Sequence, residues 1–291
     1  MCAHYKGRED MKQKPTGKLK AFINVAKKPT RVIGSVERHV LSKPPEQGRR
    51  TDVLHPSEMA SPDWCYRASY FQLLGHSVVG KKSASFRLMS VFDEGHMIHA
   101  KWQRWFQEMG VLYGKWYCHD CGEMFWGGAD CHEGPLEYKE VPLFYEPLRI
   151  FGHSDGWIKG LGDDLMLEIK SIGLGTFRWE APELMREHDG DFEKMWKNLK
   201  GPFMKHITQV QIYMKLAELL ELPNFPQEAV MIYESKASQE IKEFVIHKSD
   251  FDVAHIFQAA ADICTAIDNK TPPSCNIAAD GCSKCKGYEN V

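Results

Sequence analysis

Two carboxylates and a lysine near the middle of the chain have the residue types and spacing of a metal-assisted hydrolytic site. Asp155 lies thirteen residues before Glu168, which is followed directly by Ile169 and Lys170. Hard divalent cations such as Mg²⁺ and Mn²⁺ prefer carboxylate and carbonyl oxygens, so Asp155, Glu168 and the backbone carbonyl of Ile169 form a reasonable ligand set. Lys170 would orient or deprotonate the attacking water. The chemistry expected of this group is hydrolysis of a phosphodiester.

The elements around these residues must bring distant side chains together. Apolar residues alternate on both sides of a turn at 160–164, which predicts a β-hairpin. Successive side chains of a strand point to opposite faces, so Glu168 and Lys170 share a face, and strand pairing brings Asp155 beside them. The alternative is that Glu168 and Lys170 lie on a solvated strand. The run 165–172 is apolar around the charges, which favours a buried strand whose charges need partners or a metal ion.

These residues resemble the PD-(D/E)XK nuclease superfamily, and within it the RecB-like exonuclease branch that includes CRISPR-associated and AddB-type iron-sulfur nucleases. Asp155 and the triplet Glu168-Ile169-Lys170 match the two central motifs. The resemblance covers roughly residues 55–288. It implies an α/β fold with a restriction-endonuclease-like core, in which helices flank a central mixed β-sheet. It also implies an enzyme, a PD-(D/E)XK-type deoxyribonuclease.

Two outer motifs extend the resemblance. Upstream, Gly95 and His99 match the Gly-x-x-x-His helix of that branch, whose histidine is a metal ligand. Downstream, Gln209 and Tyr213 match its Gln-x-x-x-Tyr motif, which lies on a helix beside the active site and helps hold the substrate or Lys170. An i, i+4 pair shares one helical face, so this spacing is physically reasonable. Taken singly, each of these side chains would be interpreted as a packed or surface residue.

Hydrophobic periodicity predicts the elements that carry these motifs. Helices are expected over 91–109, 206–222 and 251–268. Strands are expected over 228–234 and 241–247. This alternation suits an α/β core with a central mixed sheet.

Six of the nine cysteines fall in two tight clusters, which in a chain without a signal peptide indicates metal binding rather than disulfides. The C-terminal cluster is Cys275, Cys282 and Cys285, and three thiolates leave a four-coordinate site one ligand short. The resemblance supplies Cys65 as the fourth ligand. It implies a [4Fe-4S] cluster that staples the two ends of the nuclease domain. Thiolates also suit zinc, so ligand chemistry alone leaves the metal open.

The second cluster looks like a small zinc ribbon. Cys118 and Cys121 form a Cys-x-x-Cys knuckle, and Cys131 follows with nine residues between. A regular ribbon would end in a second such knuckle, which this chain lacks. The fourth ligand is therefore His132 or His119. His132 directly follows Cys131, and two adjacent residues bind one tetrahedral ion with unfavourable geometry. The alternative is a set of reduced cysteines in a flexible insertion.

Charge divides the chain into two parts. Residues 1–50 contain 13 Lys or Arg and 4 Asp or Glu, whereas residues 51–291 contain 24 and 35. The basic part is expected to be a flexible tail, which either adds phosphate contacts or is merely solvated. Short strands over 21–26 and 31–36 would order parts of it. We expect one nuclease domain over 51–291, with 113–138 as an inserted zinc knuckle.

The expected function is that of a metal-dependent DNA nuclease, specifically an exonuclease on single-stranded or end-containing DNA in recombination, repair or replication, as in stand-alone nucleases of phages and prokaryotes. The expected cofactors are Mg²⁺ or Mn²⁺, a [4Fe-4S] cluster and Zn²⁺. The sequence has no Walker-type phosphate loop, so a helicase or recombination partner would be another chain. No apolar stretch suits a membrane span or a signal peptide, which predicts a cytoplasmic protein. The alternative is a noncatalytic nucleic-acid-binding or scaffold protein of a recombination or replication complex.

Overall fold

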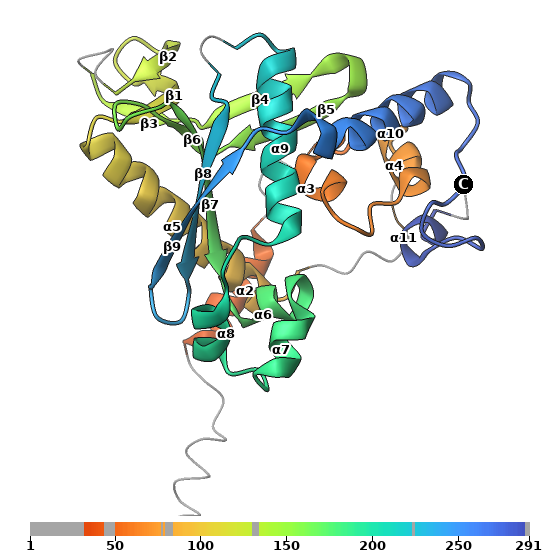
Figure 1. Cartoon of the computed structure of the whole chain (residues 1–291), viewed down its shortest axis with the longest axis horizontal. Helices are drawn as coiled ribbons and strands as arrows, with labels where there is room; N and C mark the ends of the chain where they lie inside the picture. The colour runs from red at the N-terminus through yellow and green to blue at the C-terminus, as the bar shows by residue number, and fades with distance from the viewer. Residues whose placement is uncertain are drawn as a thin grey trace, which may run out of the picture.

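A seven-stranded β-sheet forms the centre of the computed structural model, which describes residues 32–43, 50–76, 78, 84–129, 134–222 and 225–288 (Figure 1). The described strands are β1 (Leu112–Cys118), β2 (Met124–Gly128), β3 (Leu136–Tyr138), β4 (Val141–Tyr145), β5 (Ile150–Ser154), β6 (Gly156–Ile158), β7 (Leu165–Ile172), β8 (Glu228–Ser235) and β9 (Ile241–His247). The sheet order is β2-β1-β6-β7-β8-β9, and β3 also pairs with β1. Among these strands β7 and β8 pair in parallel, and the other pairs are antiparallel, including the separate β4–β5 sheet.

Helices cover both faces of this sheet. The described helices are α2 (Ile33–Ser42), α3 (Pro56–Met59), α4 (Tyr66–Leu73), α5 (Phe86–Glu108), the short 3₁₀ helix η1 (Glu146–Leu148), α6 (Leu174–Glu180), α7 (Pro182–Glu187), α8 (Phe192–Asn198), α9 (Met204–Leu219), α10 (Asp250–Asp268) and α11 (Ser283–Lys286). On one face, Ile98 of α5 packs into a core with Leu167 and Ile169 of β7. On the other, Val210 of α9 packs into a larger core with Met166. The expected mixed sheet flanked by helices is confirmed.

The hairpin around the turn at 160–164 is also confirmed. β6 pairs antiparallel with β7, with Gly156 opposite Leu167. Neighbours on both faces bury β7, so the interpretation as a solvated strand is wrong: Glu168 is only 3 % exposed. The continuous apolar character of 165–172 is the signal that distinguished the two possibilities.

The other expected elements are largely confirmed. Helices α5, α9 and α10 match the three expected helices, and strands β8 and β9 match the two expected strands. The expectation of a strand over 31–36 is wrong, because α2 begins at Ile33. Its apolar residues recur with a helical period along one face. Most of the basic segment 1–50 lies outside the described residues.

The N-terminal helices α3 and α4 lie beside the C-terminal helices α10 and α11 (Figure 1). The Asn276 side chain accepts a hydrogen bond from the Tyr66 backbone N–H and donates one to the Trp64 carbonyl, both at 2.9 Å. Lys284 Nζ lies 2.8 Å from the Asp63 carbonyl oxygen. These contacts join segments about two hundred residues apart in sequence.

Residues 113–129 and 134–138 are continuous with the central sheet. β1 pairs with β2 along one edge, and along its other edge with β3 and with β6, where Tyr113 lies opposite Trp157. Trp116 of β1 is fully buried against the α5 side. Among the described helices, none combines the length and apolar character that a bilayer span requires.

Helix α9 approaches β5 closely at Gly152. A Cβ at this position would lie 2.8 Å from Cε1 of Tyr213 and 3.0 Å from Cγ of Pro56. We expect Gly152→Ala to lower the free energy of unfolding by about 1–3 kcal/mol, because neither the buried ring nor the proline can move without disturbing its helix. Denaturant unfolding measures the change. The matched control is Gly201→Ala, whose Cβ would meet nothing within 4 Å and should change stability by less than about 0.5 kcal/mol. Equal stability of the two variants would contradict this packing argument.

Candidate active site

The six side chains singled out by the motifs come from four parts of the fold: His99 on α5, Asp155 between β5 and β6, Glu168 and Lys170 on β7, and Gln209 and Tyr213 on α9. Asp155 stands where the chain leaves the small β4–β5 sheet and enters the central one. The next residue, Gly156, has φ +154°, and a Cβ there would lie 2.6 Å from Tyr138 Oη. Only glycine allows this close crossing beside the carboxylate.

Asp155 is held on all sides. Its Oδ1 lies 3.0 Å from His99 Nδ1, and its Oδ2 accepts the backbone N–H of Ile169 at 2.6 Å. Its carbonyl oxygen accepts hydrogen bonds from Gln103 Nε2 at 3.2 Å and Tyr138 Oη at 3.0 Å. The structure therefore brings His99, Asp155 and β7 together, as the motif spacing requires.

Glu168 and Lys170 form a buried ion pair that α9 completes. Lys170 Nζ lies 2.5 Å from Glu168 Oε1. The Gln209 side chain accepts from Lys170 Nζ at 3.2 Å and donates to Glu168 Oε1 at 3.3 Å. Its Nε2 also lies 2.8 Å from Tyr213 Oη, one helical turn further along α9. Gln209 thus satisfies both members of the pair.

Glu140 belongs to the same group, and sequence reasoning missed it. It follows β3 in a left-handed conformation, with φ +58°. His99, Glu140 and Asp155 each offer a ligand atom, and these atoms lie within 4.8 Å of one another. Glu140 lies in an unremarkable Tyr-Lys-Glu-Val stretch, so no sequence signal marks it. Only the return of the chain from β3 into β4 places it beside Asp155.

The group holds more carboxylate than fixed positive charge. Burial, and then the charge of Asp155, raises the pKa of Glu140 to about 7. Burial also raises the pKa of Glu168 to about 7, with Lys170 opposing and Asp155 adding to the rise. Burial would raise the pKa of Asp155 as well, but its interaction with His99 outweighs this and leaves the pKa below its ordinary value. Three carboxyl groups thus face one lysine and one histidine.

This donor set fits a divalent cation. Carboxylate oxygens suit Mg²⁺ and Mn²⁺, and an imidazole nitrogen favours Mn²⁺. Asp155 and Glu140 supply the oxygens and His99 the nitrogen within the compact group. Glu168 is hydrogen bonded to Lys170 and Gln209 instead. The backbone N–H of Ile169 contacts Asp155, and its carbonyl remains a predicted ligand, as does Glu168.

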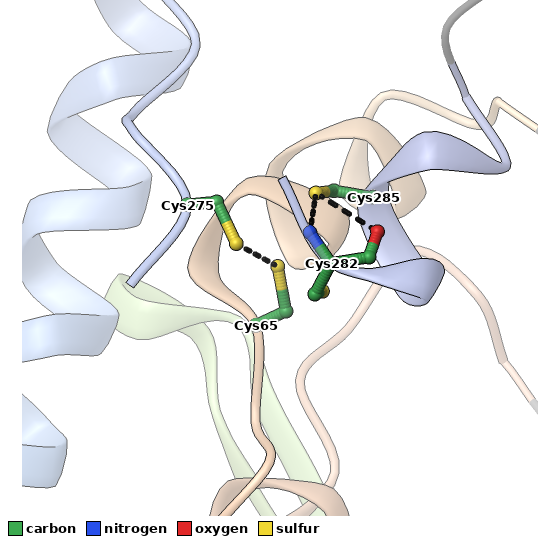
Figure 2. A group of neighbouring side chains, drawn as sticks. All are labelled: Cys65, Cys275, Cys282 and Cys285. Atoms are coloured by element: carbon green, nitrogen blue, oxygen red, sulfur yellow. Dashed lines mark hydrogen bonds between the residues drawn. The ribbon is translucent and has the colours of Figure 1, made fainter. Parts of the chain in front are cut away.

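The four cysteines Cys65, Cys275, Cys282 and Cys285 converge at the junction of the chain's two ends (Figure 2). Their sulfurs lie within 4.8 Å of one another, and the Cys65 and Cys275 sulfurs are 3.8 Å apart. This is too long for a disulfide bond of about 2.05 Å. Backbone N–H groups of Ala68 and Cys282 point at the Cys65 and Cys285 sulfurs. Hydrogen bonds from backbone N–H groups lower the pKa of Cys275 to about 6. The set fits a thiolate-bound metal.

The sulfur spacing bears on which metal fits. A tetrahedral zinc ion with Zn–S bonds of about 2.3 Å holds its sulfurs about 3.8 Å apart. The Cys65–Cys275 distance equals this edge. A [4Fe-4S] cube is larger than one ion and holds its thiolates further apart, so loading it would require the four side chains to spread.

Only part of the expected zinc knuckle is described. Cys118 is buried at the end of β1, and Cys121 is exposed in the turn before β2. Cys131 and His132 lie outside the described residues. His119 Nε2 is 3.6 Å from Glu137 Oε2. A zinc site at this turn therefore remains a prediction.

Comparison with known proteins gives distant likenesses. No protein-family model and no curated protein matches the chain. Among solved structures, it is similar to SSO0001, at 13 % identity over 80 % of this chain and 83 % of that one, with a TM-score of 0.37. It is also similar to an alkaline exonuclease, LHK-Exo from Laribacter hongkongensis, at 14 % identity over 76 % of this chain and 90 % of that one, with a TM-score of 0.43. The complex of LHK-Exo with dAMP gives 13 % identity, the same coverage and a TM-score of 0.44. Likeness at this level does not transfer an activity, so the chemistry must be argued from the site's own residues.

Replacing Glu140 should have opposite effects without and with metal. In EDTA, we expect Glu140→Gln to raise Tm, because it removes a carboxylate beside Asp155. With Mn²⁺, the variant should show a smaller rise in Tm than wild type, because metal affinity falls by at least ~10-fold. Thermal unfolding across a Mn²⁺ titration measures both effects.

The matched control for this prediction is Glu234→Gln. Glu234 is only 2 % exposed, more deeply buried than the half-buried Glu140, and is held by Lys101 and Trp102 Nε1, outside the compact metal group. This control should lower Tm in EDTA and keep the full Mn²⁺ shift. A wild-type Mn²⁺ shift in Glu140→Gln would exclude Glu140 as a ligand.

Loss of one cysteine should remove metal and stability together. Cys65→Ser takes a thiolate from the group, so the free energy that metal binding adds to folding is lost. We expect a lower metal content per chain and a lower Tm, measured by elemental analysis and calorimetry. Cys264→Ser on α10, outside the group, is the control and should retain the metal. Unchanged metal content in Cys65→Ser would argue against the four-cysteine site.

Proposed function

We propose that the protein is a metal-dependent DNA nuclease of the PD-(D/E)XK type, in the RecB-like branch, and that it acts as an exonuclease on single-stranded DNA or DNA ends. The observation that carries the proposal is the buried hydrogen-bonded group of Asp155, Glu168 and Lys170, with His99 and Gln209 bound to its members. Bringing two carboxylates and an ammonium group together away from water costs desolvation free energy, so such a group is typical of a functional site.

The ammonium group of Lys170 is held in a position to contact a phosphate or the attacking water. Glu168 and Gln209 each accept one hydrogen bond from its ammonium group, which has three N–H donors. The remaining donor can hold an attacking water or a phosphate oxygen. A positive charge fixed in this way also offsets the negative charge that develops on a phosphate under attack, without reorganisation at the moment of reaction.

The carboxylates and His99 form the metal-binding side of the group. Asp155, Glu140 and His99 would hold a divalent cation, with Glu168 and the Ile169 carbonyl as further ligands. Such a cation would polarise the phosphate and lower the pKa of a bound water. The hydrogen bond from the Ile169 N–H fixes Asp155 relative to β7. The metal-binding residues and Lys170 therefore keep fixed relative positions.

The proposal extends to the second metal centre. The resemblance implies a [4Fe-4S] cluster at Cys65, Cys275, Cys282 and Cys285, whereas the sulfur spacing suits a single zinc ion. Anaerobic purification followed by iron, sulfide and zinc analysis separates the two: iron and sulfide in equal amounts with visible absorbance indicate the cluster, and one zinc per chain without colour indicates the ion. Zinc at the turn carrying Cys118 and Cys121 would add to the total.

The proposed biological setting is DNA recombination, repair or replication, of the kind found in phages, with any helicase supplied by another chain. A noncatalytic binding or scaffold function is the rival from another class. It leaves the buried ion pair of Glu168 and Lys170 without a use. Both functions predict DNA binding, so cleavage decides between them.

Removal of the lysine should separate binding from cutting. We expect Lys170→Ala to reduce the rate of cleavage by ~10²–10³-fold or more while DNA binding changes little, because the ammonium group acts mainly on the transition state. The assay follows end-labelled single-stranded, linear duplex and closed circular DNA with Mn²⁺ or Mg²⁺. The control is Lys159→Ala, a lysine paired with Asp164 outside the group, which should cut like wild type.

Each result of this assay has a meaning. Metal-dependent cutting that spares the closed circle establishes an exonuclease, and cutting of the circle would make it an endonuclease. If folded, metal-loaded wild type bound DNA tightly but did not cut it, the proposed nuclease activity would be wrong and the noncatalytic function would be favoured.

A further inference from the structure

His206 lies on the same face of α9 as the residues that contact the ion pair. His206, Gln209 and Tyr213 follow one another at intervals of three and four residues, which places them along one side of a helix. Gln209 is hydrogen bonded to both Glu168 and Lys170. His206 therefore lies one helical turn before a residue that contacts the proposed catalytic pair. None of the sequence motifs includes it.

Contacts with β8 place His206 beside Lys170. Its Nδ1 lies 2.5 Å from Oη of Tyr233, a fully buried residue of β8. Tyr233 is the register partner of Lys170 in the parallel β7–β8 pair, and paired strands lie about 4.8 Å apart. The charge of Lys170 contributes to lowering the pKa of His206, after burial.

The hydrogen bonds of Tyr233 fix the tautomer of this imidazole. Tyr233 Oη accepts the backbone N–H of Phe203 at 2.9 Å. Its own proton then needs an acceptor, and among the described residues His206 Nδ1 lies within hydrogen-bond distance. A hydroxyl that accepted from both groups would leave its proton buried and unpaired, at a substantial cost. Nδ1 is therefore the acceptor, and the proton of the neutral ring is on Nε2.

The Nε2–H group is an available donor. No hydrogen bond joins it to any described residue, and His206 is only partly buried. It cannot act as a base or bind a metal while it carries the proton, in contrast to the imidazole of His99. The positive groups Lys170 and Lys205 are the charges that act on this ring. A donor beside a lysine suits an anionic oxygen.

We propose that His206 is a substrate-binding residue that donates its Nε2–H to a nonbridging phosphate oxygen of the nucleic-acid strand lying against Lys170. This inference rests on the proposed nuclease function and adds a specific contact to it. Tyr233 is the positioning residue, because its hydroxyl holds the ring in the donor tautomer. The ligand class is a phosphodiester backbone, recognised by charge and hydrogen bonding and without regard to base.

Two substitutions separate the two nitrogens of the ring. In His206→Asn, the short amide can still accept from Tyr233, as Nδ1 does, but no donor reaches the position of Nε2. In His206→Gln, the longer amide places an N–H near that position. We expect His206→Asn to raise KM for a single-stranded oligonucleotide on the order of 10-fold with kcat nearly unchanged, because a hydrogen bond to a charged group is lost from the substrate complex. His206→Gln should keep KM within about threefold of wild type.

The measurement is steady-state cleavage with Mn²⁺ for wild type and both variants, with Tm recorded to show that all three fold. A wild-type KM in His206→Asn overturns the inference and leaves the nuclease intact. Equal losses in both variants, or a fall in kcat at constant KM, also overturn it, since neither follows from a lost substrate donor. A folded, metal-loaded wild type that does not cut DNA overturns the proposed function and this inference with it.

Discussion

The buried ion pair between Glu168 and Lys170 is the interaction on which the arrangement of the site depends. Both side chains point to the α9 side of β7, and Glu168 is almost wholly removed from water. Removing one partner of a buried pair costs about 3–5 kcal/mol, because the other charge is then left uncompensated. Gln209 satisfies the pair only if α9 lies close to the sheet. That approach in turn requires the bare backbone of Gly152.

The other half of the site consists of His99, Asp155 and Glu140, which meet at the edge of the sheet. Helix α5, on the opposite face, brings His99 to Asp155, and the β3–β4 turn brings Glu140 to the same place. The interaction with His99 keeps the pKa of Asp155 below its ordinary value. Burial and the charge of Asp155 raise the pKa of Glu140 to about 7. A site with surplus buried carboxylate is most stable with a cation bound, which links metal binding to the stability of the fold.

The four-cysteine group has a different role from the charged site. It joins Cys65, at the start of α4, to three cysteines that follow α10, across 210 residues of sequence for the Cys65–Cys275 pair. Closing so long a loop in the unfolded chain is entropically costly, so a metal held there favours the folded state. The hydrogen bonds of Asn276 to the same N-terminal segment reinforce the junction without a metal. A metal bound by this group would therefore stabilise the frame that holds α9 and β7 in place.

The sequence by itself determined the local elements and the residues with recognisable chemistry. Period-two alternation and apolar runs predicted the β6–β7 hairpin, and helical periodicity predicted α5, α9 and α10, because these patterns follow from contacts within each element. Motif spacing identified Asp155, Glu168 and Lys170. Tertiary structure alone decided that Glu140 joins them and that His206 stands beside Lys170, because both depend on contacts between segments far apart in sequence. It also decided that β1 extends the central sheet, since strand pairing of this kind is set by packing over the whole core and not by any local pattern.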